Sequence, residues 1–351
     1  MKKVFVGLSG GVDSSVTAAL LKKQGYDVTG VYMKNWSQDL PGFECPWKED
    51  FQDAKRVAVQ LGIDFKMYDF ETEYRHRVVD YMIDGYKQGI TPNPDIMCNQ
   101  EVKFKLFLET ALADGADMIA TGHYSRVKDG QLLTAKDGNK DQTYFLYRVT
   151  EEALRQSLMP IGEYQKSEVR KLAKEFDLAT AEKKDSQGIC FVGKVGIREF
   201  LEQFVESEPG PIIEQHGVTI GQHDGAIFYT IGQRHGLNVG GGLPYYVVGK
   251  DMAKNEVYVT TDIDDSRLWK SELSLTNLHW INGQPNLDKT YYIRTRYRQP
   301  LTGAKLQIQD GPVSGENRLL VVLDEPVRAI TPGQSAVIYD GDQCLGGGIV
   351  V

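Results

Sequence analysis

The residues best suited to chemistry stand near the start of the chain, in the stretch SGGVDS at residues 9–14. An apolar run at residues 4–8 precedes this stretch, and a helical pattern at residues 12–23 follows it. A strand, a glycine-rich turn and a helix N-terminus together form an anion site, because backbone N–H groups and the helix dipole face the anion. The serine hydroxyls add donors, and the Asp13 carboxylate suits a metal counter-ion. The stretch therefore predicts a site for phosphate groups.

A second candidate is Cys98, which lies in the stretch TPNPDIMCN at residues 91–99, three residues after Asp95. Two prolines stiffen this stretch, so we expect it to stay outside both flanking helices, with the next helix beginning near Gln100. A nearby helix N-terminus lowers the pKa of a thiol, which predicts a Cys98 thiolate near pH 7 and lets Asp95 accept or return a proton. An ordinary structural loop would account for the same residues.

The other cysteines give weaker signals. Cys190 lies in the stretch SQGICFV at residues 186–192, which by itself is typical of a short buried strand with a core cysteine. Cys45 and Cys344 have no neighbour that indicates a role. The chain has no Cys-x-x-Cys pair, which argues against a zinc ribbon or an iron–sulfur cluster and predicts no metal held by protein ligands alone.

These residues need a scaffold, and the first ~200 residues alternate between strand and helix patterns, as βαβ units do. Apolar runs occur at residues 4–8, 28–33, 64–70 and 117–121. Helical patterns occur at residues 12–23, 48–61, 72–89, 100–114, 151–158 and 166–176. The alternation predicts an α/β domain with a parallel sheet and helices on both faces. Because ligands bind at the carboxyl ends of such strands, we expect residues 9–14, 33–36 and 122–124 to form one pocket.

The sequence pattern changes near residues 206–211, and short alternating runs then replace the helical periodicity. We expect strands at residues 226–231, 245–250, 256–260, 291–297, 319–323 and 336–339. A second boundary falls at residues 262–268. The expected domains are a catalytic domain at 1–200, a small central β-rich domain at 205–268 and a C-terminal β-barrel at 269–351.

Bulk properties exclude some classes of protein. The net charge of −8 counts against indiscriminate nucleic-acid binding, although it leaves room for a local basic patch. No run approaches the ~18 apolar residues of a membrane span. The residues Met1, Lys2 and Lys3 lead directly into an apolar run, so we expect no signal peptide and a cytoplasmic location.

Taken together, the motifs resemble one known family. The stretch SGGVDS resembles the pyrophosphate loop of ATP pyrophosphatases, which split ATP into AMP and pyrophosphate. Five segments occur in order: SGGVDS (9–14), TPNPDIMCNQEVKF (91–104), ATGHY (120–124), KDQTYFLY (140–147) and DSQGICF (185–191). With the β-rich C-terminal half, they resemble the bacterial tRNA-specific 2-thiouridylases over the whole chain. The resemblance implies an adenine nucleotide alpha hydrolase-like domain and ATP-dependent thiolation at C2 of the wobble uridine of tRNA, through an adenylated base.

The resemblance also implies roles for single residues. ATP, with Mg²⁺, is expected at Gly7, Leu8, Ser9, Gly10, Gly11, Val12, Asp13, Ser14, Met33 and Gly122. The expected catalytic residues are Cys190, which carries a persulfide, Cys98, which releases the sulfur and forms a disulfide with Cys190, and Asp95. Contacts with tRNA are expected from Asn93, Pro94, Asp95, His123, Lys140, Asp141, Gln142, Arg296, Tyr297 and Gln334. The expected partners are tRNA and a persulfide donor, such as a cysteine desulfurase or a sulfur-relay protein.

Two other functions are compatible with the glycine-rich loop alone. An AMP-forming ligase for a small molecule would use the same loop, but it would leave Cys98 and Cys190 without a role. A non-catalytic protein that binds an adenine nucleotide would leave the β-rich half without a purpose.

Overall fold

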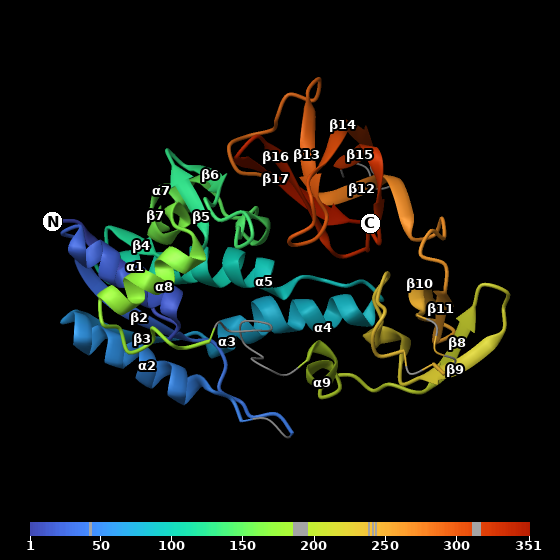
Figure 1. Cartoon of the computed structure of the whole chain (residues 1–351), viewed down its shortest axis with the longest axis horizontal. Coiled ribbons are helices and arrows are strands. Elements are labelled where there is room, and N and C mark those ends of the chain that lie inside the picture. Colours follow the sequence, from blue (N-terminus) through green and yellow to red (C-terminus); the bar gives the residue numbers. More distant parts are fainter. Residues whose placement is uncertain (42–43, 185–195, 238, 241, 243, 311–316) are drawn as a thin grey trace.

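The computed structural model describes residues 1–41, 44–184, 196–237, 239–240, 242, 244–310 and 317–351. Figure 1 shows an α/β domain in blue and green, a β-barrel in orange and red, and a small yellow β-sheet beside them. Among the described residues, we find no helix with both the length and the apolar character that crossing a bilayer requires.

The N-terminal domain is built on a five-stranded sheet with the order β3-β2-β1-β4-β7. Its strands are β1 (Lys3–Gly7), β2 (Asp27–Lys34), β3 (Asp64–Asp69), β4 (Met118–Ala120) and β7 (Ser157–Leu158). Every neighbouring pair is parallel, which confirms the predicted sheet. The helix predicted at residues 151–158 is too long, because α7 (Glu151–Arg155) ends early and Leu158 pairs with Ala120 of β4.

Helices cover both faces of this sheet, as predicted. One face carries α1 (Val12–Lys23), α2 (Trp47–Leu61) and α8 (Lys166–Glu175); the other carries α3 (Glu71–Tyr74), η1 (Arg75–Val79), η2 (Cys98–Leu106) and α6 (Phe107–Ala113). Helix α4 (Asp80–Lys87) continues from η1 away from the sheet, toward the central domain. Side chains alternate along β1, as a strand requires. Val4 and Val6 pack in the cluster that contains residues of α1 and α2, whereas Phe5 packs in the cluster that contains Phe107 of α6.

The helix that carries Cys98 begins earlier than the sequence predicts. Helix α5 (Pro94–Met97) continues without a break into η2, so the expected start near Gln100 is wrong. The two prolines do not keep this stretch outside the helix, because Pro94 occupies the first helical position, where its missing N–H costs nothing. Asn93 caps the helix, and its side-chain oxygen accepts from the N–H groups of Asp95 and Ile96.

The central domain contains a four-stranded sheet with the order β10-β11-β8-β9. It follows α9 (Ile197–Leu201) and comprises β8 (Gly210–Glu214), β9 (Thr219–His223), β10 (Tyr246–Asp251) and β11 (Glu256–Thr260). The strand predicted at residues 226–231 is wrong, because that segment forms the 3₁₀ turn η5 (Ala226–Phe228). All three residues of this turn are buried. In a half-exposed strand, buried and exposed side chains would alternate instead.

The C-terminal domain is a β-barrel of β12 (Trp269–Trp280), β13 (Thr290–Arg294), β14 (Thr302–Asp310), β15 (Asn317–Arg328), β16 (Ser335–Asp340) and β17 (Gln343–Val350). Pairing between β12 and β17 closes it. A hairpin from the N-terminal domain, β5 (Ser125–Lys128) and β6 (Gln131–Thr134), extends the barrel sheet through pairing of Leu132 with Cys344. The first and last domains therefore share a sheet, which the sequence did not indicate.

Buried polar contacts also join these two domains, and we call this set the barrel seam. It lies between residues 141–147, which include the turn η3 (Thr143–Phe145), and strands β13 and β16. The Asp141 carboxylate accepts from Arg294 at 3.2 Å, and Asp141 is almost fully buried. The Tyr144 hydroxyl donates to the Ser335 carbonyl at 2.9 Å, and the Tyr147 hydroxyl pairs with the Ser335 hydroxyl at 3.0 Å. The seam fixes how the barrel sits on the catalytic domain.

The seam predicts a large stability effect at Arg294. Replacing Arg294 with Met leaves the Asp141 carboxylate buried without its cation, so we expect the free energy of unfolding to fall by about 3 kcal/mol in chemical denaturation. The matched control is Lys289→Met, which removes an exposed barrel ion pair with Asp340 and costs less than about 1 kcal/mol. Equal effects of the two variants would contradict a structural role for the seam.

Candidate functional site

The glycine-rich loop between β1 and α1 has the geometry of an anion site. Gly10 has a φ of +75°, in the left-handed region that favours glycine, and a Cβ there would lie 2.5 Å from the Asp50 carbonyl oxygen. The hydroxyl oxygens of Ser9 and Ser14 lie 3.2 Å apart, and Ser14 also donates to the Gly11 carbonyl at 3.1 Å. The loop thus combines backbone N–H groups at a helix N-terminus with two converging hydroxyls.

Neighbouring strands bring the other predicted nucleotide residues to this loop. A Cβ on Gly122, which follows β4, would lie 2.7 Å from the Ser14 nitrogen, and a Cβ on Gly7 would lie 3.0 Å from the Met33 methyl carbon. The carboxyl ends of β1, β2 and β4 therefore meet, as expected for a ligand site in a parallel sheet. The structure gathers there all ten predicted residues: Gly7, Leu8, Ser9, Gly10, Gly11, Val12, Asp13, Ser14, Met33 and Gly122.

Two side chains hold the loop carboxylate, and sequence reasoning missed one of them. The Lys166 ammonium lies 2.8 Å from each oxygen of Asp13, and the Tyr124 hydroxyl donates to Oδ1 at 2.8 Å. Tyr124 belongs to a segment that was expected at the pocket. Lys166 was noted only as the first residue of a helical pattern, and no spacing in the sequence connects it with Asp13.

The loop fits the triphosphate of a nucleotide better than it fits a resident metal ion. Among the described residues, no group of three His, Cys, Asp or Glu side chains is placed to hold a metal. A Mg²⁺ ion at Asp13 would therefore need phosphate oxygens as further ligands, which is the usual way nucleotide enzymes bind it. A glycine-rich turn at a helix N-terminus, with hydroxyls that can donate, suits those phosphates.

Cys98 is more deeply buried than the sequence predicts. Its side chain is inaccessible, and it packs in the core cluster that contains Tyr74 and Val78. Burial raises the pKa of Cys98, and Asp95 raises it further, while Lys103 acts in the opposite direction. The expected lowering of this pKa is wrong for the structure described, because the lost hydration of the thiolate outweighs the helix N-terminus.

The remaining cysteines add little to the site. Cys190 lies outside the described residues, so its pairing with Cys98 stays a prediction. Cys45 and Cys344 are buried, and burial raises the pKa of both thiols.

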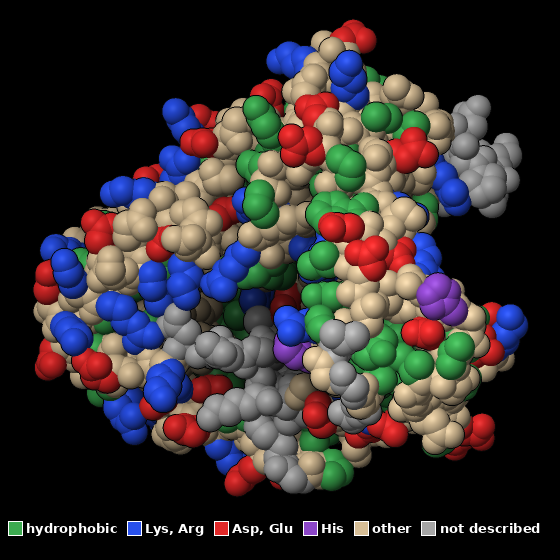
Figure 2. All heavy atoms as spheres, turned by 45° about the vertical axis from the view of Figure 1, so that its right-hand side comes forward, with side chains coloured by type: hydrophobic (Ala, Val, Ile, Leu, Met, Phe, Trp, Pro, Cys, Tyr) green, Lys and Arg blue, Asp and Glu red, His purple; other side chains and the backbone are tan. Residues whose placement is uncertain are grey.

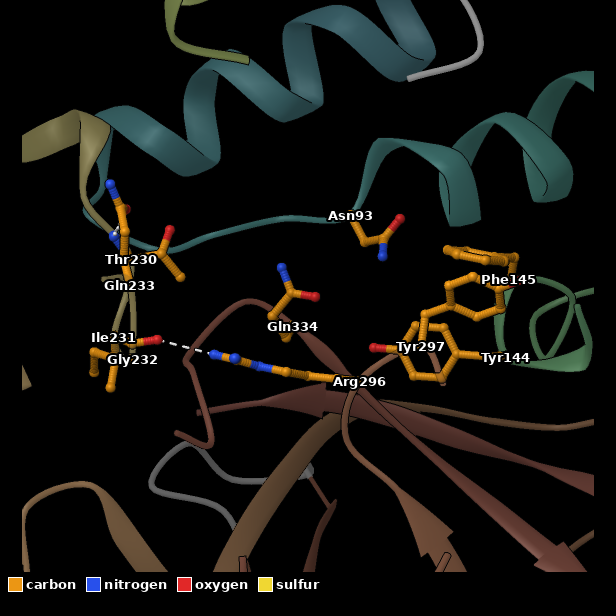
Figure 3. A pocket seen from close by; sticks show the side chains of 10 residues that line it. All are labelled: Asn93, Tyr144, Phe145, Thr230, Ile231, Gly232, Gln233, Arg296, Tyr297 and Gln334. Atoms are coloured by element: carbon orange, nitrogen blue, oxygen red, sulfur yellow. Dashed lines mark hydrogen bonds between the residues drawn. The ribbon is translucent and has the colours of Figure 1, made fainter. Parts of the chain in front are cut away.

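A cavity of about 390 Å³ lies where the three domains meet. Figure 3 shows its walls, which come from the N-terminal domain, the central domain and the barrel. The lining residues are Asn93, Tyr144, Phe145, Thr230, Ile231, Gly232, Gln233, Arg296, Tyr297 and Gln334. Figure 2 shows the surface hollowed between the domains, with Lys and Arg side chains gathered on the left-hand border of the hollow. The cavity therefore depends on how all three domains are placed.

Hydrogen bonds across the domains set the shape of this cavity. The Gln334 amide donates to the Thr91 carbonyl at 2.8 Å, and the hydroxyls of Thr91 and Thr230 lie 3.2 Å apart. The Arg296 guanidinium crosses the cavity to donate to the Ile231 carbonyl at 2.9 Å, as Figure 3 shows. Burial lowers the pKa of Arg296, but a guanidinium stays charged at neutral pH.

One side of the cavity is aromatic. The rings of Phe145 and Tyr297 lie 4.6 Å apart between centroids, with 48° between their planes. The Arg298 guanidinium lies 5.1 Å from the centroid of the Tyr297 ring. Aromatic side chains next to a guanidinium are typical of sites that stack an unpaired nucleobase.

The cavity brings together four predicted tRNA residues: Asn93, Arg296, Tyr297 and Gln334. Pro94 and Asp95 follow Asn93 directly on α5. The segment Thr230, Ile231, Gly232 and Gln233 of the central domain completes the wall. Sequence reasoning missed this segment, because it predicted a strand there and found no chemical signal.

The other predicted tRNA residues make internal contacts. His123 is buried with its Nδ1 2.8 Å from the Thr121 hydroxyl, and burial lowers the pKa of His123 well below its ordinary value. Asp141 belongs to the barrel seam, and the Gln142 side-chain oxygen accepts from the Tyr124 N–H at 2.8 Å. Lys140, next to Asp141, is half-buried. Contacts of these four residues with tRNA stay predictions.

Comparison with family models assigns all three parts of the chain. Residues 2–194 match the tRNA methyl transferase HUP domain, residues 198–261 match the tRNA methyl transferase PRC-barrel domain, and residues 270–350 match the aminomethyltransferase beta-barrel domain. Among solved structures, the chain is similar to a 4-thiouridine synthetase in complex with RNA and bound ATP, at 20% identity and a TM-score of 0.39, over 57% of this chain and 50% of that one.

Similarity to whole curated proteins is much closer. The chain is 49% identical to the tRNA-specific 2-thiouridylase MnmA of Lacticaseibacillus paracasei, and 48% identical to that of Bacillus subtilis. Each match covers 99% of this chain and 94% of the relative. At this identity and coverage, the chain belongs to the tRNA-specific 2-thiouridylase family.

Proposed function

We propose that this protein replaces the C2 oxygen of the wobble uridine of tRNA with sulfur, and that it converts ATP to AMP and pyrophosphate in doing so. The observation that carries the proposal is the cavity, in which Asn93 meets Arg296, Tyr297 and Gln334 although some 200 residues separate them in sequence. Family membership sets aside the two alternatives, a small-molecule ligase and a non-catalytic nucleotide-binding protein.

The activation step belongs to the glycine-rich loop. The C2 oxygen of uracil is a poor leaving group, and adenylation converts it into AMP, which leaves far more readily. The loop N–H groups and the hydroxyls of Ser9 and Ser14 hold the triphosphate, so that its α-phosphate meets the base oxygen. Mg²⁺, with Asp13 as its protein ligand, would neutralise the charge that develops on the departing pyrophosphate.

The sulfur step belongs to the two cysteines. A cysteine desulfurase or a relay protein loads Cys190 as a persulfide, and the terminal sulfur attacks C2 and expels AMP. The Cys98 thiolate then attacks the Cys190 sulfur, which releases the transferred sulfur to the base and leaves a Cys98–Cys190 disulfide for a cellular thiol to reduce. Asp95, three residues before Cys98 on the same helix, takes the thiol proton. Since Cys98 is inaccessible here, this step needs tRNA-bound protein in which the thiol is uncovered.

The substrate has to present an unpaired base. The wobble uridine leaves its stack to reach the site, and the aromatic side of the cavity supplies a replacement surface for a base of the anticodon loop. The proposed working units are residues 1–200 for catalysis, with 205–268 and 269–351 completing the tRNA site. We also propose a cytoplasmic location, where the enzymes that donate the persulfide sulfur and the tRNA are both present.

The function is tested by product analysis with ATP, unmodified tRNA and a persulfide donor. We expect AMP, pyrophosphate and 2-thiouridine in equal amounts in a single turnover, each dependent on tRNA. Asp13→Ala should abolish pyrophosphate release, whereas Asp114→Asn, an exposed carboxylate paired with Lys66, should not. Pyrophosphate release that needs no RNA would contradict the proposal and favour a small-molecule ligase.

The cysteine roles predict a split between the two half-reactions. In a single turnover, Cys190→Ser should still release pyrophosphate with tRNA but form no 2-thiouridine, because activation does not use the thiol. Cys98→Ser should stall with the tRNA base joined to Cys190 through a disulfide, because no second thiol releases the transferred sulfur, and free sulfide should restore part of its activity. The control is Cys344→Ala, a thiol buried in the barrel, which should behave as the unchanged protein. A turnover-dependent disulfide that involves Cys45 or Cys344 would contradict the assignment.

The aromatic side of the cavity predicts a defect in tRNA binding. Tyr297→Ala removes one stacking ring, so we expect the Kd for tRNA to rise about tenfold, within the usual range for one stacked base. The slope of affinity against salt should stay steep and unchanged, because no phosphate contact is lost. Tyr292→Ala, an exposed tyrosine of β13 in the same barrel, is the control and should bind normally. Equal affinities for all three proteins would place the RNA elsewhere.

A further inference from the structure

The loop carboxylate expected to share a metal ion is already neutralised by a lysine. The Lys166 ammonium lies 2.8 Å from both oxygens of Asp13, so that both face the same cation. The Asp13 and Lys166 side chains are only 30% and 15% exposed, so water and salt screen this pair less than a surface pair. We call it the Asp13–Lys166 pair. A second cation that binds Asp13 at short range is repelled by this ammonium.

The position of Lys166 allows its ammonium to move. Its backbone is fixed, because Lys166 is the first residue of α8 and its N–H donates to the Asp137 carboxylate at 2.9 Å. Its ammonium lies 5.6 Å from the centroid of the Tyr124 ring, and the Tyr124 hydroxyl also donates to Asp13. The flexible four-carbon stem of lysine can therefore move the charge while α8 stays in place.

The chemistry of a metal–nucleotide complex supplies the reason for a move. Among the described residues, no cluster of three potential ligands surrounds Asp13, so a divalent ion needs this carboxylate as well as phosphate oxygens. When the ion binds Asp13, it repels the Lys166 ammonium at short range. A triphosphate bound at the loop, at Gly10, Gly11 and Ser14, would lie next to Asp13 and could receive that ammonium.

We propose that Lys166 is an exchangeable cation: it closes Asp13 to metal ions in the free protein, and it moves onto the phosphates when the metal–nucleotide complex arrives. The protein thus accepts metal and nucleotide together rather than metal alone. On the phosphates, Lys166 stabilises the negative charge of the departing pyrophosphate. This inference rests on the proposed ATP site.

A purely structural pair would behave differently. If Lys166 only tied α8 to the loop, its removal would lower the melting temperature and leave the order of metal and nucleotide binding unchanged. Metal binding without nucleotide therefore distinguishes the two roles, and it needs no turnover.

The test is a titration of the whole protein with Mn²⁺, followed by the electron paramagnetic resonance of the free ion, with and without α,β-methylene-ATP. We expect Lys166→Met to bind Mn²⁺ alone about tenfold more tightly than the unchanged protein, because Asp13 is released. It should bind the analogue with Mn²⁺ about tenfold more weakly, because the phosphates lose a cation. Lys166→Arg should restore analogue binding, and kcat for pyrophosphate release should fall more than KM rises in Lys166→Met.

The control is Lys174→Met, on the same helix, which removes an exposed ion pair with Glu182 at 2.8 Å and should change neither titration. If Lys166→Met does not fold, Lys166→Gln replaces it in the test, because glutamine removes the charge but keeps a hydrogen-bond donor toward Asp13. If Lys166→Met, or Lys166→Gln in its place, binds Mn²⁺ alone no more tightly than the unchanged protein does, while the unchanged protein binds the analogue, only this inference is overturned. An unchanged protein that binds no analogue would overturn the proposed ATP site as well.

Discussion

The barrel seam is the interaction on which the rest of the structure depends. Its members are polar and buried, so their side chains need partners, and this placement of barrel and catalytic domain supplies partners for Asp141, Tyr144 and Tyr147. That placement puts Arg296, Tyr297 and Gln334 opposite Asn93 and closes the cavity. The β5–β6 hairpin reinforces it through backbone pairing with β17. The cavity wall, built from three domains, is therefore held by the barrel seam together with hydrogen bonds of its own lining residues, such as that from Gln334 to Thr91.

One helix connects the cavity with the nucleotide loop. It begins beside Asn93 at the cavity, carries Cys98 in its first turns, and places the Phe104 ring 5.6 Å from the ring of His123. Gly122, next to His123, closely approaches Ser14 of the glycine-rich loop. A short series of packed residues thus connects the cavity, the Cys98 thiol and the glycine-rich loop, as the proposed coupling of adenylation to sulfur transfer would require. The net charge of −8 does not oppose this arrangement, because the cations that matter are local.

Sequence reasoning predicted the parts that depend on local pattern. The parallel sheet, the glycine-rich loop and the barrel follow from periodicity and turn residues, and they are confirmed. Long-range contacts could not be predicted from local patterns. No residue near Lys166 in the sequence indicates that its side chain contacts Asp13, and nothing in residues 230–233 indicates that they line a cavity. The Cys98 prediction was wrong for a related reason. Local sequence shows a helix N-terminus, whereas burial in a core formed with distant residues such as Val78 raises the pKa of the thiol. The family resemblance suggested which residues contact tRNA. It did not show that the Asp141 carboxylate is paired with Arg294 in the barrel seam.

In the proposed function, the wobble base enters at the cavity between the three domains. The most direct measurement is photo-crosslinking with tRNA that carries 5-iodouridine at the wobble position, followed by mass spectrometry of the crosslinked peptides. We expect crosslinks to the aromatic rings of Phe145 or Tyr297, or to the peptide that contains Asn93. Crosslinks confined to the far surface of the barrel, such as the exposed Ile308 of β14, would contradict this expectation.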